Sequence, residues 1–407
     1  MPCSPSSVMA PSSASWSERP GSGAAPPSRV YLDYAGLAPV DPRVVAVMRP
    51  FLEGGIGNPG APHSLGLEAR ASLDGARAKL ARLFGGTPGG VIFTSGATEA
   101  NNLAIKGVMA RAAGRHLVTS TVEHVSVLNP CRDLEKQGVS VTYVGVDAEG
   151  RLDPRAVAAA LRPDTALVSV MAGNGEIGAL QPLREIGRIT RARGIPFHVD
   201  GVNALGRLPV SVDELGIDLL TIGSNDLYGP PGAGALWVRP HVKLAPIILG
   251  GGQERGYRSG TENLPAIVGM GVAAELARTE RATEAARLAR LRDRLLHEVP
   301  ARVPGARITG PTGEARLPHH ASFVIPGVKA DSVLLELDLR GIAASSGSAC
   351  ATLTGQASHV LRAIGCDPDA AEGSICFTLG RWTTPAEIDV VLEVLPAVVA
   401  RLRRLGP

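Results

Sequence analysis

Lysine is scarce in this chain of 407 residues, which carries 41 lysines and arginines together. Only five of these cations are lysines, namely Lys79, Lys106, Lys136, Lys243 and Lys329. No lysine lies between Lys136 and Lys243, so that stretch holds no amine side chain that could form a Schiff base. Chemistry that needs a lysine must therefore come from one of these five positions.

Cysteine is also sparse and irregularly spaced. The five cysteines make an odd number, and no pair has the C-x-x-C spacing. This pattern argues against a disulfide framework and against a zinc site. It is typical of a reducing compartment, so we expect a cytoplasmic protein without a bound metal.

Long apolar runs and a strong charge of one sign are absent as well. No apolar run approaches the ~20 residues of a membrane span. The net charge of +3 is too small to indicate nucleic acid or an anionic membrane as a partner. Residues 1–28 are rich in Ser, Pro, Ala and Gly and lack the basic start and apolar centre of a secretory signal. We therefore predict a disordered tail over residues 1–28, with a start assigned too far upstream as the alternative.

Short β-branched runs alternate with helical stretches from about residue 67 onward. The seven predicted strands lie in "GVIFTSG", "HLVTS", "VSVTYVGV", "TALVSVMAG", "PFHVDG", "LLTIGS" and "GALWVR". This alternation predicts an α/β fold with a mainly parallel seven-stranded sheet that helices cover on both faces. We assign this large domain to residues 29–281, with its first residues packing against a smaller α+β domain over 282–407.

The stretch "FTSGATEANN" (Phe93 to Asn102) has the pattern of a strand, a glycine turn and a helix start. Free backbone N–H groups and the hydroxyls of Ser95 and Thr98 can hold a phosphate at such a helix start. Thr98 can equally be a simple helix cap. These residues alone leave the two interpretations open.

Two further polar residues directly follow predicted strands. The imidazole of His124 can stack on a flat ring, or it can be a hydrogen-bonded residue at a helix start. Asp200 ends the strand in "FHVDG", where a carboxylate can pair with a protonated pyridine nitrogen. The alternative for Asp200 is a strand-end aspartate that caps a turn.

Cys350 is surrounded by small, hydrogen-bonding residues in "ASSGSACATLTGQASHVL". A structural cysteine normally has large apolar neighbours, so we predict that Cys350 is an exposed, reactive thiol. Cys131, Cys366 and Cys376 lie in helical or strand contexts and are predicted to be structural. Arg381 follows a strand in "TLGRWTT", where its guanidinium can clamp a carboxylate or form a surface ion pair.

The order of these motifs resembles the cysteine desulfurase family, whose members are PLP-dependent and have the class V aminotransferase fold, a PLP transferase fold of type I. The similarity covers nearly all of the chain from Tyr31 onward. It rests on "YLDYAGLAPVDPRV", "GNPGAPHSLG", "FTSGATEANNLAIKG", "TVEHVSVLNPCRDLE", "FHVDG", "YGPPGAGALWVR", "GGGQERGYRSGTEN", "SSGSACAT" and "TLGRWTTPAEID".

The resemblance implies a role for each candidate residue. L-cysteine, or a related amino acid, would be held by Arg381 and Asn174. The thiolate of Cys350 would attack its sulfur, leaving a persulfide and alanine, and a sulfur-acceptor protein would take the persulfide sulfur. Thr261 would reach the PLP phosphate of a partner subunit, which implies a homodimer. The implied cofactor-binding residues are Ala97, Thr98 and Ser224 at the phosphate, His124 stacked on the ring, Asp200 at the pyridine nitrogen and Asn203 near the ring hydroxyl.

The turn before "YGP" departs from the family pattern. That pattern reads roughly Ser-Gly-His-Lys, and its lysine forms the Schiff base with PLP. The same positions here are Gly223, Ser224, Asn225 and Asp226. A carboxylate cannot form a Schiff base, so PLP at this site would bind without a covalent link. Nearby, Asn203 replaces a glutamine and Gly175 replaces an asparagine of the family pattern.

The sequence thus predicts a cysteine desulfurase-like protein with a degenerate cofactor site and slow or altered turnover. Sulfur from L-cysteine would pass through a persulfide on Cys350, and Asp226 would act as the base. The alternative is a catalytically silent relative without PLP, which binds an active desulfurase as a heterodimer or accepts a persulfide. A third hypothesis is unrelated chemistry with Asp226 and Asn225 as new polar contacts.

Overall fold

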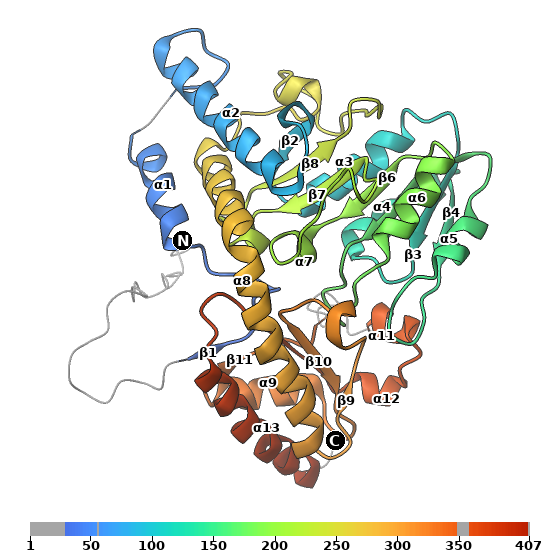
Figure 1. Cartoon of the computed structure of the whole chain (residues 1–407), viewed down its shortest axis with the longest axis vertical. Helices are drawn as coiled ribbons and strands as arrows, with labels where there is room; N and C mark the ends of the chain where they lie inside the picture. The colour runs from blue at the N-terminus through green and yellow to red at the C-terminus, as the bar shows by residue number, and fades with distance from the viewer. Residues whose placement is uncertain (1–28, 55–56, 348–357, 406–407) are drawn as a thin grey trace, which may run out of the picture.

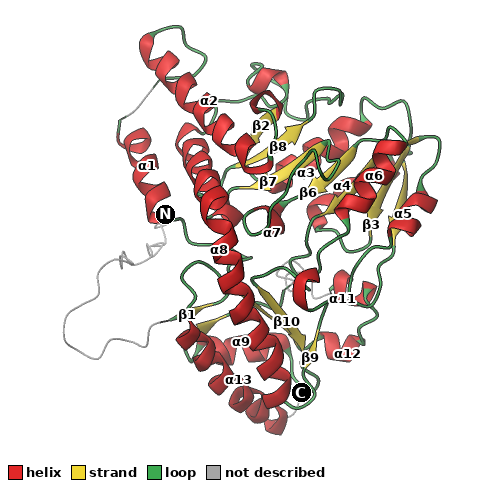
Figure 2. Ribbon diagram, viewed as in Figure 1, coloured by secondary structure: helices red, strands yellow, loops and turns green. Residues whose placement is uncertain are grey.

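The computed structural model describes residues 29–54, 57–347 and 358–405. Its largest element is a seven-stranded sheet with the order β2-β8-β7-β6-β5-β3-β4 (Figures 1 and 2). The strands are β2 (Val91–Thr94), β3 (His116–Ser120), β4 (Ser140–Val144), β5 (Thr165–Met171), β6 (Phe197–Asp200), β7 (Leu219–Gly223) and β8 (Gly234–Val238). Only β8 runs antiparallel to its two neighbours in this sheet, so the predicted mainly parallel sheet is confirmed.

Helices cover both faces of this sheet, as the alternation of side chains requires. Along β5, Val168 and Val170 join the core beneath α2, α5, α6 and α8, whereas Leu167 joins the core beneath α3 and α4. The helices that follow in the chain are α1 (Pro42–Glu53), α2 (Ser64–Phe84), α3 (Ala97–Met109), α4 (Val125–Lys136), α5 (Pro154–Ala160), α6 (Leu183–Ala192), α7 (Val202–Leu205) and α8 (Leu264–Arg302).

Local sequence features fix where these helices begin and how closely they pack. Asp41 caps α1, because its side chain accepts a hydrogen bond from the backbone N–H of Arg43 at 2.9 Å. Glycine at position 271 lets α8 approach α2, since a Cβ there would lie 2.7 Å from the Cα of Ala76. Helices α1 and α2 lie beside the first half of α8 (Figure 1).

A second, smaller layer is built on a three-stranded antiparallel sheet with the order β12-β10-β9. The N-terminal strand β1 pairs in parallel with β11 beside it, and Val30 and Leu32 join the core of this layer. Its elements are β1 (Val30–Tyr31), β9 (Arg307–Ile308), β10 (His320–Val324), α9 (Ala330–Asp338), β11 (Ile342–Ala343), α11 (His359–Ala363), α12 (Pro368–Ala371), β12 (Ser374–Thr378) and α13 (Pro385–Leu405).

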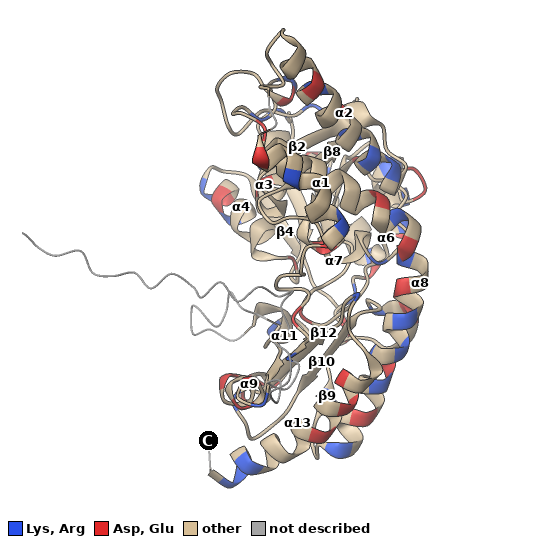
Figure 3. Ribbon diagram, turned by 90° about the vertical axis from the view of Figure 1, so that its left-hand side faces the viewer, with Lys and Arg blue, Asp and Glu red and all other residues tan. Residues whose placement is uncertain are grey.

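The 39-residue helix α8 connects the two layers. Residues from Leu264 to Ala277 belong to the core of the large sheet, and residues from Leu288 to Val299 belong to the core of the small one. The predicted boundary at residues 281/282 therefore falls inside α8, between the two cores. Figure 3 shows basic and acidic residues along the outer side of this helix, whose basic residues are all arginines apart from one histidine. No helix among the described residues is long and apolar enough to cross a membrane.

Candidate functional site

A cavity of about 560 Å³ lies where the carboxyl ends of parallel strands meet the small sheet. Ligands of open α/β sheets bind at such strand ends. Its walls come from the ends of β5 and β6, from the segment after β3, from α4 and α11, from the start of α3 and from β12. The lining segments fall within residues 33–36, 97–98, 122–132, 171–176, 200–203, 345–347, 359–362 and 376–378.

The start of α3 offers an anion-binding end to this cavity. Ala97 and Thr98 line the cavity, and in the described part of the chain their backbone N–H groups donate to no protein acceptor. Thr98 is exposed and does not cap the helix with its side chain. The Glu99 carboxylate has partners elsewhere. It accepts a hydrogen bond from the Ser95 backbone N–H at 2.8 Å and forms an ion pair with Arg258 at 3.0 Å. This helix start suits a phosphate.

A chain of hydrogen bonds connects Asp200 with His124 across the cavity wall. Asn101 donates through Nδ2 to Asp200 Oδ2 and to Ser126 Oγ, both at 2.8 Å. The Ser126 hydroxyl lies 2.7 Å from His124 Nδ1. Burial raises the pKa of Asp200, although the hydrogen bond from Asn101 opposes this shift. The structure thus brings the two predicted ring contacts into one cavity and one network.

Three further acids line the cavity that the sequence analysis did not single out. Burial raises the pKa of Asp33, raises that of Glu123 to about 8 and raises that of Glu176 to about 7. Glu123 is fully buried, and its Oε2 has no hydrogen-bond partner among the described residues. His359 also lines the cavity and lies 2.9 Å from the Glu123 carbonyl oxygen. The sequence analysis did not predict these four residues as part of the site, because the type of a residue does not show whether folding will bury it.

The turn that follows β7 holds Asp226 in a short 3₁₀ segment, Asn225–Leu227. Burial raises the pKa of Asp226 to about 7, with the Arg207 guanidinium lowering it and the Asp200 carboxylate raising it. Ser224 is buried, and its hydroxyl has no partner in the described part of the molecule. Neither Ser224 nor Asp226 lines the cavity itself. Asn225 accepts a hydrogen bond from the Ala38 backbone N–H at 2.9 Å and so anchors the N-terminal segment.

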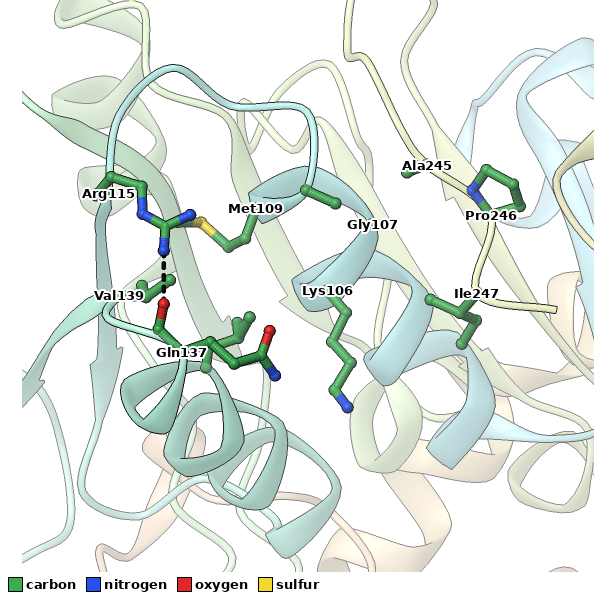
Figure 4. Close-up of a pocket in the computed structure, with 11 residues that line it drawn as sticks. Lys106, Gly107, Met109, Arg115, Gln137, Val139, Ala245, Pro246 and Ile247 are labelled. Atoms are coloured by element: carbon green, nitrogen blue, oxygen red, sulfur yellow. Dashed lines mark hydrogen bonds between the residues drawn. The ribbon is translucent and has the colours of Figure 1, made fainter. Parts of the chain in front are cut away.

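None of the residues that line the cavity is a lysine. Lys106 lines a separate cavity of about 210 Å³ between α3, α4 and residues 245–247 (Figure 4). Its ammonium pairs with Asp133 at 2.7 Å, and the two cavities share no lining residue. No lysine outside the turn therefore substitutes for the one that Asp226 replaces.

Arg381 lies outside the cavity, where the structure does not place it as a substrate clamp. Its guanidinium pairs with Asp41, with Glu280 at 2.9 Å and with Glu284 at 3.2 Å. It also lies over the Tyr228 ring at 4.7 Å from the centroid, and Arg207 covers the same ring at 4.4 Å. In this structure the guanidinium is bound to acids of the protein itself, and its side chain is 15% exposed.

The remaining predicted residues fall into three groups. Asn174 and Asn203 both line the cavity. The amide of Asn174 is largely used inside the protein, because it donates to the Val122 carbonyl at 2.9 Å and accepts from the Glu176 backbone N–H at 2.8 Å. Thr261 is exposed on the surface. Cys350 lies outside the described residues, so its placement stays a prediction.

Cys376 was predicted to be structural, and it is buried in β12, where it also forms part of the cavity wall. It is buried, and its sulfur lies 3.1 Å from His320 Nε2. Its backbone pairs with Ser345, at the edge of the described part before Cys350. The cavity thus has a thiol at the position on β12 that faces Asp33 and Glu176, whose negative charges raise the pKa of that thiol further after burial.

These walls fit part of a PLP molecule. The start of α3 suits its phosphate, Asp200 suits its pyridine nitrogen and His124 suits its ring face. Ser224, predicted at the phosphate, does not line the cavity, although its hydroxyl has no partner among the described residues. The covalent anchor is missing, so the residues present fit a non-covalently bound cofactor.

The class V aminotransferase family matches residues 30–391. The chain is 48% identical to the cysteine desulfurase IscS 1 of Archaeoglobus fulgidus over 379 residues, 93% of this chain and 98% of that protein. The cysteine desulfurase IscS of Dictyoglomus turgidum is 45% identical over 93% of this chain and 96% of that protein. A solved NifS-like protein superimposes with a TM-score of 0.86 at 34% identity, over 92% of this chain and 100% of that one. The solved structure of SspA in complex with cysteine superimposes with a TM-score of 0.76 at 34% identity, over 87% of this chain and 100% of that one.

The family match covers most of the chain, and the two relatives are similar to it over almost their whole length. The structural match extends to the PLP transferase fold of type I that the sequence predicts. The chain therefore belongs to the class V aminotransferases and, within them, to the cysteine desulfurase family.

Proposed function

We propose that this chain handles sulfur from L-cysteine through a persulfide on Cys350 and binds PLP without a covalent anchor. The family is PLP-dependent, and its named relatives are cysteine desulfurases. One observation carries the proposal. The cavity keeps an anion-binding helix start and the hydrogen-bonded chain from Asp200 to His124, although the lysine is gone.

Bound PLP supplies an electron-poor ring that stabilises negative charge at the substrate Cα. In this proposal, α3 holds the phosphate, Asp200 faces the pyridine nitrogen and His124 covers the ring. Asp226 does not line the cavity, so in this proposal its side chain turns toward the substrate Cα to move the proton there, and its pKa of about 7 suits proton exchange near neutral pH. A carboxylate is shorter than a lysine side chain and differs in charge, so turnover is slow, with a loss on the order of 10²–10⁴-fold.

The sulfur step balances without an external oxidant or reductant. The thiolate of Cys350 attacks the sulfur of L-cysteine, and an S–S bond forms while the substrate Cβ–S bond breaks. The electron pair of that bond stays on carbon, which gains a proton, so alanine leaves and Cys350 carries the persulfide. A sulfur-acceptor protein then takes the outer sulfur.

The first test is an absorbance spectrum of the purified protein, recorded alone, after adding PLP and after adding L-cysteine. We expect a visible band that appears with PLP, shifts with L-cysteine and is lost on gel filtration. Mass spectrometry should then find one added sulfur on Cys350, and the Cys350→Ser variant is the control. A protein-only spectrum at all PLP concentrations, with no sulfur on Cys350, would refute the proposal.

A catalytically silent relative is the second candidate. The observation that favours it is the double loss of the lysine and of a free Arg381. Such a protein would accept a persulfide on Cys350 from an active desulfurase, in a heterodimer or by transient contact. Sulfur on Cys350 that appears only with an active desulfurase and L-cysteine present supports this candidate over the first.

We further propose that the chain forms a homodimer in the cytoplasm. Exposed large apolar side chains on α1, on α2 and at residues 247–249 support a second copy as the partner, because a partner chain would remove them from water. Thr261 is exposed in one chain, as a contact to the partner's phosphate site requires. The irregular cysteine spacing supports a reducing compartment.

A further inference from the structure

Cys350, the proposed sulfur carrier, belongs to residues 348–357, which we call the Cys350 segment. The described residues on its two sides, Gly347 and Ser358, both contact one acid of the cavity wall, Glu176. The Ser358 hydroxyl lies 2.5 Å from Glu176 Oε2. A Cβ added at Gly347 would lie 3.4 Å from the Glu176 carbonyl oxygen and 3.6 Å from its Cα. The two flanks of the Cys350 segment therefore meet at one residue of the wall.

The flank before the segment is fixed to β12. Ser345 exchanges two backbone hydrogen bonds with Cys376, at 2.7 and 3.1 Å. The Ser345 hydroxyl also accepts from the Gly347 backbone N–H at 3.0 Å. Gly347 has a φ of +83°, a conformation that favours glycine. Glycine at this position thus lets the chain turn against the backbone of Glu176 just before the Cys350 segment begins.

The flank after the segment is fixed through the Ser358 hydroxyl. Its oxygen caps α11 by accepting from the backbone N–H of Val360 at 3.1 Å and of Leu361 at 3.2 Å. These two bonds use both lone pairs of the oxygen, so the remaining hydrogen is donated to Glu176. Burial raises the pKa of Glu176 to about 7, and a carboxyl oxygen accepts this hydrogen in the ionised and in the protonated form.

Glu176 itself is held by contacts outside both flanks. Asn174 Oδ1 accepts from the backbone N–H groups of Glu176 at 2.8 Å and of Ile177 at 3.0 Å. Asn174 Nδ2 donates to the Val122 carbonyl at 2.9 Å. Ile177 belongs to the same apolar cluster as Val360 on α11. A fixed turn thus presents the Glu176 carboxyl to the cavity and to Ser358.

We propose that Glu176 is a positioning residue for sulfur transfer, because it fixes both flanks of the Cys350 segment to the cavity in which the proposed function places L-cysteine. Its carboxyl acts through Ser358 and takes part in no covalent step. The inference rests on the proposed function, since it assigns the residue that sets where Cys350 meets its substrate. The contacts that carry it lie within the described residues and can be tested without turnover.

The first test measures the reactivity of Cys350 in the full-length protein without PLP. Iodoacetamide labelling followed by peptide mass spectrometry gives the alkylation rate of Cys350 relative to that of Cys3 in the same digest. We expect this ratio to rise about tenfold in Glu176→Ala, because Ser358 loses its acceptor. Glu176→Gln keeps an acceptor oxygen and should stay within about twofold of the wild type.

The Ser358→Ala variant should reproduce the effect of Glu176→Ala, and the double variant should add little, because both changes remove the same hydrogen bond. Glu149→Ala, on an exposed turn, is the matched control and should leave the ratio unchanged. An unchanged ratio in both alanine variants, or equal ratios in Glu176→Gln and Glu176→Ala, would overturn the proposal. Circular dichroism checks folding, and Ser358→Ala decides the question if Glu176→Ala does not fold.

The second test measures the rate at which sulfur appears on Cys350 with PLP and increasing L-cysteine. Glu176→Ala should lower the maximal rate about tenfold and leave the KM for L-cysteine within about twofold, because Glu176 acts on the position of the thiol and not on substrate binding. A raised KM with an unchanged maximal rate would make Glu176 a substrate contact and overturn the proposal.

Failure of this inference can be distinguished from failure of the proposed function. If the wild type takes up no sulfur, the proposed function fails, and the alkylation ratios alone decide the role of Glu176. If sulfur appears at equal rates on the wild type and on Glu176→Ala, the proposed function stands and the positioning role is wrong.

Discussion

At the scale of single residues, position 226 decides whether the cofactor is anchored. Its carboxyl lies near enough to Asp200 for the two charges to influence each other, and Arg207 lies beside it. The other cavity groups that suit PLP come from different segments of the chain and do not depend on this turn. Restoring an amine at position 226 should therefore restore the anchor without rebuilding the rest of the cavity.

The Asp226→Lys variant should retain PLP through gel filtration and turn yellow. Borohydride reduction followed by peptide mass spectrometry should locate the PLP mass at position 226. The Asp226→Asn variant removes the acid without adding an amine and should lose PLP on the column. Loss of PLP from the lysine variant as well would mean that Asn203, Gly175 and Asn225 have reshaped the site too far for a covalent link.

Glu123 should make the protein less stable as pH rises. Its pKa is raised from 4.5 to about 8, so the folded state holds a proton that the unfolded state loses. Its favourable contribution is complete below pH 4.5 and is lost as pH rises toward 8, by at most about 1.4 kcal/mol per pH unit.

Urea unfolding of the wild type and of the Glu123→Gln variant between pH 5 and 9 checks this prediction. Glutamine keeps the acceptor for Ser120 but cannot ionise, so the stability of the variant relative to the wild type should increase with pH. The Glu149→Gln change, on an exposed turn, serves as the control and should give parallel curves. Parallel curves for Glu123→Gln would contradict the raised pKa.

The effects of substitutions at Gly175 and Asn203 on the free energy of unfolding should be coupled. A Cβ at position 175 would lie 3.1 Å from both the nitrogen and the oxygen of the Asn203 amide, so Asn203 occupies the space that a larger residue 175 would need. Gly175→Ala should cost about 1 kcal/mol of unfolding free energy alone and clearly less in the Asn203→Ala background. A double-mutant cycle by urea unfolding measures this coupling, and strictly additive costs would exclude it.

At the scale of secondary-structure elements, the sequence predicted all seven strands of the large sheet. Each is a short β-branched run bounded by glycine or polar residues, and such runs are buried on both faces of a mainly parallel sheet. The two-residue strands β1, β9 and β11 were not predicted, because pairing over two residues leaves no periodic pattern. The ion-pair partners of Arg381 could not be predicted from the sequence either, because Asp41 lies 340 positions away in the chain.

The contacts of Arg381 should stabilise the fold, because they join four segments of the chain. Arg381 contacts Asp41 before α1, Tyr228 after β7, and Glu280 and Glu284 on α8. Arg381→Ala removes one of the two arginines that pair with the nearly buried carboxylate of Asp41, which keeps Arg43, so the loss should be that of a charged hydrogen bond, about 2 kcal/mol. The affinity for L-cysteine should change little, because Arg381 does not line the cavity.

Urea unfolding and calorimetry on the same samples separate these two effects. Arg401→Ala, an exposed arginine on α13, is the matched control and should change neither quantity. A stable Arg381→Ala protein with weakened L-cysteine binding would return Arg381 to the role of a substrate clamp.

At the scale of the whole molecule, the cavity is assembled from segments that are far apart in the chain. Residues 33–36 and 376–378 form neighbouring parts of its wall, because the N-terminal segment packs with the small sheet. His124, Asp200, Asn174 and Asn203, which the family resemblance singles out, all line this cavity, and their roles toward a cofactor or substrate stay predictions. The resemblance did not reveal the acidic character of the wall, which arises only when Asp33, Glu123 and Glu176 are brought together by folding.

A second copy of the chain should cover the exposed apolar residues of α1 and α2. Leu52, Leu65 and Leu67 are 68%, 54% and 60% exposed, which is unfavourable for large aliphatic side chains in water. Sedimentation equilibrium should therefore give twice the 42.0 kDa mass of one chain. Introducing two charges by Leu65→Glu with Leu67→Glu should reduce the mass to that of one chain, because the interface would have to bury carboxylates. Leu405→Glu, at an exposed position on α13, should leave the larger mass unchanged. A wild-type protein that sediments as one chain would mean that these leucines meet a different partner, as the heterodimer with an active desulfurase requires.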